Sequence, residues 1–255
     1  MLRLVHRFRH NPGMVATALP SFLAEICVGL DAPGLVVLEP GGRHACHAAA
    51  WPAWQALVAA AAKAGIELAA VSAYRSFAQQ EAIWNAKWRG ERPVLDRAGQ
   101  PVPMAPLNAA ERVAAILAWS ALPGASRHHW GTEFDVIDRA ALPPGYVVQL
   151  VPAEYAAGGP FAKLGRWLDE NSQALGFHRP YRRDLGGVAP EPWHLSCTAV
   201  AGEASRRLRL AHLHEAIARS SMEGRAAVLA ELPALYERYV RRVDRPPPLR
   251  KRPMK

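Results

Sequence analysis

The feature that most constrains the fold is a pair of short polar motifs, SRHHWGTEFD at residues 126–135 and EPWH at residues 191–194. The first motif offers His128 and Asp135 and the second offers His194, three side chains that commonly bind metal ions. His128 and Asp135 can converge if the chain turns between them and then enters a strand, and His194 must arrive from a neighbouring strand. The sequence therefore predicts that two segments far apart along the chain lie side by side.

These three side chains would leave one position open on a tetrahedral metal ion, as a hydrolytic zinc site requires. Such an ion lowers the pKa of a bound water to roughly 7 and polarises a carbonyl. Glu191 precedes His194 by three residues and could take the proton of that water without binding the metal. Each residue alone is more commonly structural, and His129 is expected not to be a ligand, so the prediction depends on the combination.

The periodicity of apolar residues predicts a fold with separate helices and strands. The expected helices are residues 47–64, Ser76 to about Trp88, Asn108 to about Ala121, 161–175, and two between 201 and 243 that separate near Glu223-Gly224. The expected strands are residues 67–73, a half-buried strand at 131–138, and 192–197. Segregated helices around a few strands favour an α+β fold, and the Pro-rich stretch 89–107 is expected to be a long functional loop.

The net charge of +9 is concentrated partly in the tail that ends the chain. That tail could hold the protein near an anionic polymer, or it could be a solvated terminus. No aromatic residues alternate with its basic residues, so we expect no nucleic-acid partner. The chain contains no run of eighteen apolar residues and thus no predicted transmembrane segment, and its start is a poor secretory signal. Three scattered cysteines argue against a disulfide framework, and Cys197 is expected to be a buried thiol.

The two motifs resemble those of a known enzyme family. S-x-H-x-x-G-x-x-x-D followed by E-P-W-H is similar to the LAS-type zinc peptidases, the VanY-like D-alanyl-D-alanine carboxypeptidases of peptidase family M15. The block SAYRSFAQQ at residues 72–80 resembles the family's S-G-Y-R-S-Y-x-x-Q, and LGFHRPY at 175–181 resembles a family stretch that we interpret as structural. The resemblance covers roughly residues 45–200.

The resemblance implies a role for each residue that matches these blocks. Arg75 would bind and polarise the substrate, and a planar guanidinium suits both a carboxylate and a developing oxyanion. The implied set is one Zn²⁺ on His128, Asp135 and His194, with Glu191 and Arg75 catalytic, and Arg75, Ser76, Gln80 and Ser126 binding substrate.

The resemblance also implies a fold and an activity. The fold would be a small antiparallel sheet flanked by helices, of the LAS/hedgehog type, over residues 45–200. Residues 1–44 would be an irregular N-terminal segment, 201–243 a helical extension packed on the domain, and 244–255 a basic disordered tail. The expected activity is D,D-carboxypeptidase action on a peptidoglycan stem peptide or muropeptide by a monomer in the periplasm or cell envelope.

Several alternatives stay open at this point. The same scaffold could act as an L,D-carboxypeptidase or endopeptidase, or as a non-catalytic zinc-containing cell-wall module, and the protein could act in the cytoplasm. The presence of both Glu191 and Arg75 favours an enzyme. A serine D,D-peptidase is excluded because the chain has no S-x-x-K and no K-T-G. The His214-Glu215 pair lacks the second histidine of a zinc helix, and we expect His212 and His214 to be surface residues.

Two positions depart from the family pattern. Glu133 stands where many members carry a small residue, and Ala73 replaces a glycine. We expect neither to touch a metal ligand, and we expect Glu133 to alter the charge near the metal.

Overall fold

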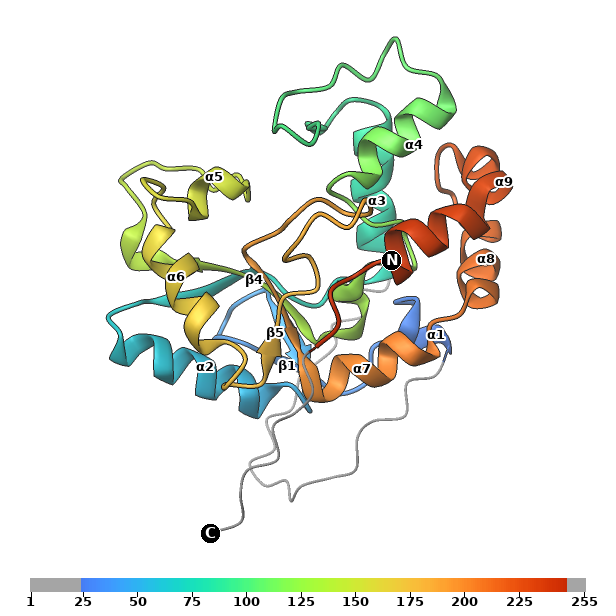
Figure 1. Ribbon diagram of the computed structural model, residues 1–255. Coiled ribbons are helices and arrows are strands. Elements are labelled where there is room, and N and C mark those ends of the chain that lie inside the picture. The colour runs from blue at the N-terminus through green and yellow to red at the C-terminus, as the bar shows by residue number, and fades with distance from the viewer. Residues whose placement is uncertain (1–23, 247–255) are drawn as a thin grey trace.

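The centre of the molecule is a four-stranded antiparallel sheet. The computed structural model describes residues 24–246, and the strands follow the order β3-β4-β6-β5 across the sheet (Figure 1). Their bounds are β3 Leu68–Ser72, β4 Glu133–Asp138, β6 His194–Cys197 and β5 Phe177–His178. A separate two-stranded sheet pairs β1 Leu35–Val37 with β2 Ala45–His47. The predicted α+β fold with a small antiparallel sheet is confirmed.

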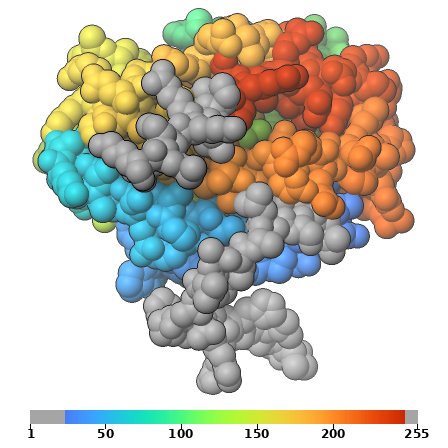
Figure 2. Space-filling view, turned by 60° about the horizontal axis from the view of Figure 1, so that its bottom comes forward, coloured from blue at the N-terminus to red at the C-terminus, as the bar shows by residue number. Residues whose placement is uncertain are grey.

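Helices surround this sheet, and they segregate from the strands as expected. Helices α2 and α7 lie along the bottom of Figure 1, on the face that Figure 2 turns toward the viewer, while α3 and α4 rise at the upper right. The α-helices are α1 Ala24–Cys27, α2 Trp51–Lys63, α3 Phe77–Trp88, α4 Ala109–Leu117, α5 Pro152–Tyr155, α6 Ala162–Asn171, α7 Thr198–Arg207, α8 Leu210–Ala218 and α9 Arg225–Leu235. Two 3-10 turns, η1 Arg127–Trp130 and η2 Arg139–Ala141, and a π-helical turn, η3 Tyr236–Arg241, complete the elements.

The helices that border the site begin at the predicted caps. Ser76 Oγ accepts a hydrogen bond from the backbone of Gln79, and the Gln79 side chain accepts one from the backbone of Ser76. Asn108 and Glu111 make the same reciprocal pair at the start of α4. Both are capping boxes, which satisfy donors that the first turn of a helix leaves free.

Strand β4 differs from its prediction because all six of its residues are buried. The alternation of polar and apolar residues predicted a strand with one solvated face. The apolar face packs in the core, where the Phe134 ring stacks on Trp54 with 4.5 Å between ring centroids. The polar face carries Glu133 and Asp135 and faces the candidate site. The alternation in this strand therefore distinguishes the face that serves the site from the face that packs in the core.

The two ends of the described chain hold more regular structure than the sequence suggested. Helix α1 and strand β1 lie within the segment expected to be irregular. The predicted break near Glu223-Gly224 is present, because α9 begins directly after Gly224. The region expected to hold two helices contains α8 and α9 as well as most of α7, and a second break at Leu208-Arg209 separates α7 from α8. The expectations for residues 1–23 and 247–255 concern residues outside those that the structure describes.

Candidate active site

A tight turn brings the first motif into strand β4. The 3-10 turn η1 ends at Gly131, whose φ of +66° favours glycine, and a Cβ there would lie 2.8 Å from the backbone nitrogen of His47. Gly131 therefore allows His128, in the turn, and Asp135, in the strand, to face the same point. In the ladder between β4 and β6, Asp135 pairs directly with His194. This register places the His194 side chain beside those of His128 and Asp135.

His128, Asp135 and His194 form a group that could hold a metal ion. One donor atom from each lies within 4.8 Å of the others, and all three residues are buried. Asp135 Oδ2 is 3.2 Å from His128 Nε2, and Asp135 Oδ1 is 3.1 Å from His194 Nδ1. Two imidazole nitrogens and a carboxylate oxygen are a donor set suited to Zn²⁺.

The outer nitrogens of both histidines are already bound to the protein. His128 Nδ1 donates to the carbonyl oxygen of Ala73 at 2.7 Å, and His194 Nε2 donates to Glu133 Oε2 at 2.9 Å. These bonds orient each ring so that His128 Nε2 and His194 Nδ1 face Asp135 and are the nitrogens that would bind a metal ion. Asp135 Oδ1 is buried and has no hydrogen-bond partner among the described residues. The residues thus fit a metal ion, which would satisfy that oxygen.

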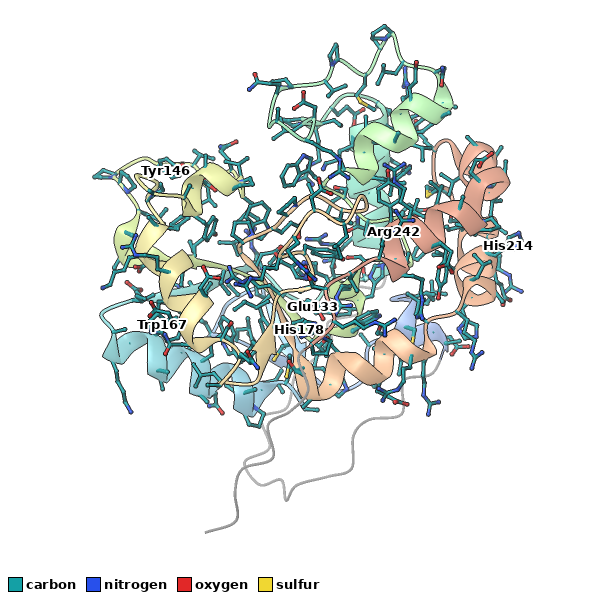
Figure 3. All side chains as sticks on the ribbon, viewed as in Figure 1. Glu133, Tyr146, Trp167, His178, His214 and Arg242 are labelled. Atoms are coloured by element: carbon teal, nitrogen blue, oxygen red, sulfur yellow. The ribbon has the colours of Figure 1, made fainter. Side chains whose placement is uncertain are left out.

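The expectation that Glu133 and Ala73 touch no ligand was wrong. Glu133 is fully buried at the centre of the molecule (Figure 3) and holds the His194 ring. Its carboxylate also accepts from Thr132 Oγ1 at 3.0 Å, from Ser196 Oγ at 2.8 Å and from Arg127. Ala73 contacts His128 through its backbone, which the residue type does not reveal.

Arg127 compensates the charge of Glu133. Its Nε and Nη2 atoms each lie 3.2 Å from the Glu133 carboxylate, and only 7% of the arginine is exposed. Burial tends to raise the pKa of Glu133, but Arg127 and His194 outweigh it and lower that pKa to about 2. The carboxylate therefore stays ionised and orients His194, while its charge is balanced by Arg127.

Glu191 lies beside the metal group but is not one of its three members. Its Oε2 is 3.3 Å from His194 Nδ1, and its backbone donates to the carbonyl of Tyr181, which positions the residue. Burial raises the pKa of the Glu191 carboxyl, although His194 partly offsets this effect. A carboxylate with a raised pKa is a better proton acceptor than one with an ordinary pKa.

Arg75 is held in the site by its neighbours. Its Nη1 donates to Gln80 Oε1 at 2.7 Å and its Nη2 to Ser72 Oγ at 2.8 Å. Its backbone carbonyl accepts from His129 Nδ1 at 2.6 Å. The other ring nitrogen of His129 accepts from the Gly124 backbone, so this histidine is not in the metal group. His129 thus helps to place the arginine.

A cavity of about 400 Å³ contains the metal group, Glu191, Arg75 and Ser126. Ser76 and Gln80 are not among its lining residues: Ser76 caps α3, and Gln80 bonds to Arg75 and to the carbonyl of Ala121. Their role in binding substrate stays a prediction, and the structure gives them a positioning role.

The cavity also contains residues that the sequence did not single out. The loop 89–107 contributes Arg92, Pro93 and Leu95, which agrees with the functional loop that its length suggested. The stretch 175–181, interpreted as structural, contributes Tyr181, whose ring packs edge-on against His194 with centroids 5.0 Å apart. The remaining lining residues that were missed include Ile83, Lys87, Trp119, Ser120, Arg127, Val148, Gln149, Leu150 and Val188, while Trp193 comes from the EPWH motif.

The other sequence features lie away from this cavity. Cys197 is a buried free thiol, as expected, and so are Cys27 and Cys46. His214 is exposed on α8 at the edge of the molecule (Figure 3), and His212 is half-buried on the same helix. Across residues 24–246, none of the helices combines the length and the hydropathy needed to cross a membrane.

Comparison with known proteins gives partial matches to relatives and to solved structures. An uncharacterized protein of Haemophilus influenzae is 35% identical over 121 residues, which cover 47% of this chain and 92% of that protein. A D-alanyl-D-alanine carboxypeptidase of Enterococcus faecalis is 34% identical over 79 residues, covering 30% of this chain and 24% of that enzyme. A crystal structure of a mutant vancomycin-resistance D,D-pentapeptidase VanY in complex with Zn(II) is 26% identical, with a TM-score of 0.47 over 72% of this chain and 88% of that one.

A family model covers most of the chain. The model of VanY, D-alanyl-D-alanine carboxypeptidase, matches residues 43–200. That span includes the block around Arg75, the turn with His128, strand β4 with Asp135, and β6 with His194. On this match, the chain belongs to the VanY family of D-alanyl-D-alanine carboxypeptidases.

Proposed function

We propose that this protein is a zinc-dependent D,D-carboxypeptidase that removes the terminal D-alanine from peptidoglycan stem peptides. One observation carries the proposal: the metal group of His128, Asp135 and His194 shares a single cavity with Glu191 and Arg75. A metal site with a structural role alone would need neither a free buried carboxylate nor a guanidinium beside it. The family to which the chain belongs supports the same reaction class.

The protein's own groups divide the work of hydrolysis. A zinc ion bound by the three ligands would supply a Lewis acid that polarises the scissile carbonyl and activates water. Glu191 accepts a proton at its carboxylate and returns it to the leaving amine. Burial raises the pKa of its carboxyl, which makes the carboxylate a better proton acceptor.

Arg75 and Ser126 bind the substrate in this proposal. The Arg75 guanidinium, held by Gln80 and Ser72, meets either the carbonyl oxygen as it gains charge or the terminal carboxylate of the peptide. Ser126 lines the cavity next to the η1 turn and can bond the peptide backbone. Because Arg75 is positioned before substrate arrives, little reorganisation is needed.

The bond that is cut is the finer part of the proposal. We place D,D-carboxypeptidase action first because the family is described by that activity. L,D-carboxypeptidase or endopeptidase action on the same scaffold is the alternative, and the cavity walls around Trp119 and Trp193 would decide between them. The rings of these tryptophans are stacked with centroids 6.1 Å apart, and both residues line the cavity.

Incubation of the zinc-loaded protein with purified muropeptides, followed by mass spectrometry, tests the activity and the bond together. We expect loss of one alanine from pentapeptide stems and no change in tetrapeptide stems. Glu191→Gln should retain zinc and lose nearly all turnover, whereas Lys163→Met, on an exposed lysine outside the cavity, should remain active. Activity retained in Glu191→Gln would remove Glu191 as the proton acceptor, and trimming of tetrapeptides would favour the L,D alternative.

A peptidoglycan substrate also suggests where the protein acts. We propose the periplasm or cell envelope, with action on recycled muropeptides in the cytoplasm as the alternative. Fractionation of the native host with detection of the protein in each compartment tests this proposal.

A further inference from the structure

One wall of the cavity carries a lysine that the proposed reaction does not use. Helix α3 contributes Ile83 and Lys87 to the lining, one helical turn apart. Lys87 Nζ donates to Ser120 Oγ at 2.6 Å, and Ser120 lines the same cavity just after α4. The ammonium is therefore fixed at the cavity wall by a neutral partner.

No carboxylate in the described part of the chain neutralises this ammonium. Among the described residues, neither Lys87 nor Arg92, which lines the cavity from the loop 89–107, has an acidic side chain within ion-pair distance. Arg127, in the same cavity, is by contrast paired with Glu133. Lys87 is half-buried, and a partly desolvated cation without an anion is unfavourable, so this arrangement suits a wall that receives an anion from outside.

The electrostatics of Lys87 agree with this reading. Burial, together with the positive charges of Arg92 and Arg75, lowers the pKa of Lys87 to about 8, while Glu191 acts in the opposite direction. At neutral pH the side chain is still mostly protonated. An anion bound nearby would relieve the repulsion among the three cations.

We propose that Lys87, Ser120 and Arg92 form a subsite that binds a carboxylate of the peptide substrate. This inference rests on the proposed function, because it concerns how the same cavity recognises its peptide. Lys87 and Ser120 would donate hydrogen bonds from the wall, and the exposed Arg92 would attract the carboxylate at the cavity rim.

Two carboxylates of a stem peptide have the required chemistry. One is the C-terminal carboxylate, one residue beyond the scissile bond. The other is the α-carboxylate of the γ-linked glutamate, on the opposite side of the scissile bond. Arg75 is a separate group near the metal ligands, so the subsite adds a second anchor and selects for acidic peptides over neutral ones of the same length.

Binding without turnover gives the sharpest test. Zinc-loaded protein carrying Glu191→Gln is titrated calorimetrically with L-Ala-γ-D-Glu-L-Lys-D-Ala-D-Ala and with two analogues, each with one of the two carboxylates converted to an amide. We expect one analogue to bind about tenfold more weakly than the parent peptide. When Lys87→Met is added, the parent should weaken by a similar factor and the difference between parent and that analogue should disappear. The analogue that loses affinity identifies the carboxylate.

Lys163→Met is the matched control and should leave all three affinities unchanged. Lys87 also lies in the last turn of α3, where a cation can stabilise the helix end; a purely structural role would lower the melting temperature of Lys87→Met without removing the difference between the peptides. Equal binding of all three peptides, or an unchanged difference in Lys87→Met, would overturn the subsite. Binding with the expected pattern but no hydrolysis by the wild-type protein would instead overturn the proposed function alone.

Discussion

Replacing Glu133 with alanine should destabilise the protein strongly, even in the absence of metal. The substitution leaves the Arg127 guanidinium with 7% exposure and without its carboxylate, and removes acceptors for Thr132 Oγ1, Ser196 Oγ and His194 Nε2. Breaking a buried ion pair by removing one partner costs about 3–5 kcal/mol. Glu133→Gln keeps one acceptor oxygen and should cost less, about 1–3 kcal/mol. Urea denaturation of the metal-free proteins measures both values.

The same substitution should weaken metal binding separately. Loss of the bond from His194 Nε2 lets the ring rotate and removes the carboxylate that favours Nδ1 as the ligand atom, and such outer partners contribute about 10–100-fold in affinity. Competition with a chromophoric chelator measures the affinity. Glu154→Ala is the control: this buried glutamate bonds Tyr146 and the backbone of Gln149 instead of a ligand, so it should lower stability and leave metal affinity unchanged. Wild-type affinity and stability in Glu133→Ala would refute the reasoning.

The remaining predictions concern the metal, the arginine and the lysine. Zinc at a hundred times its dissociation constant should stabilise the folded protein by about 2.7 kcal/mol. This stabilisation should raise the melting temperature, and His128→Ala should abolish the increase. Arg75→Ala should lose about 2–4 kcal/mol of transition-state stabilisation, seen in kcat/KM at unchanged zinc content; an unchanged kcat/KM would exclude Arg75 from the reaction. The pKa of Lys87 is lowered from 10.5 to about 8, so between these values the unfolded chain binds more protons at this site than the folded protein. The free energy of unfolding should therefore rise with pH across that window, by on the order of 2–3 kcal/mol more in the wild-type protein than in Lys87→Met. Urea denaturation at a series of pH values measures this difference, and parallel stability–pH profiles of the two proteins would contradict the pKa shift.

The parts of the site that the sequence predicted are those in which function imposes fixed residue types. Two histidines and an aspartate at motif spacing predicted that β4 and β6 would be neighbours, and the register places Asp135 opposite His194. The starts of α3 and α4 were also predictable, because Ser76 and Asn108 cap their helices through contacts within four residues.

The parts that were missed depend on contacts between distant segments. The sequence pattern places Glu133 on the solvated face of a strand, but in the structure β6 covers it with His194 and Ser196. In the sequence, Lys87 is an ordinary basic residue at the end of a helix. Its hydrogen bond to Ser120, 33 positions away, at the cavity wall is visible only in the structure. The break between α7 and α8 has no glycine or proline to announce it, since Leu208-Arg209 are the residues that leave the helical conformation.

The burial of strand β4 on both faces has a consequence for redesign. Phe134 is locked in the core next to the two carboxylates that serve the metal group, so a movement of Asp135 would have to disturb the packing of the whole molecule. The segments 92–95 and 148–150, by contrast, line the cavity from outside the sheet. Exchanging these two segments between relatives should therefore alter which peptide is accepted while the hydrolytic centre keeps its geometry.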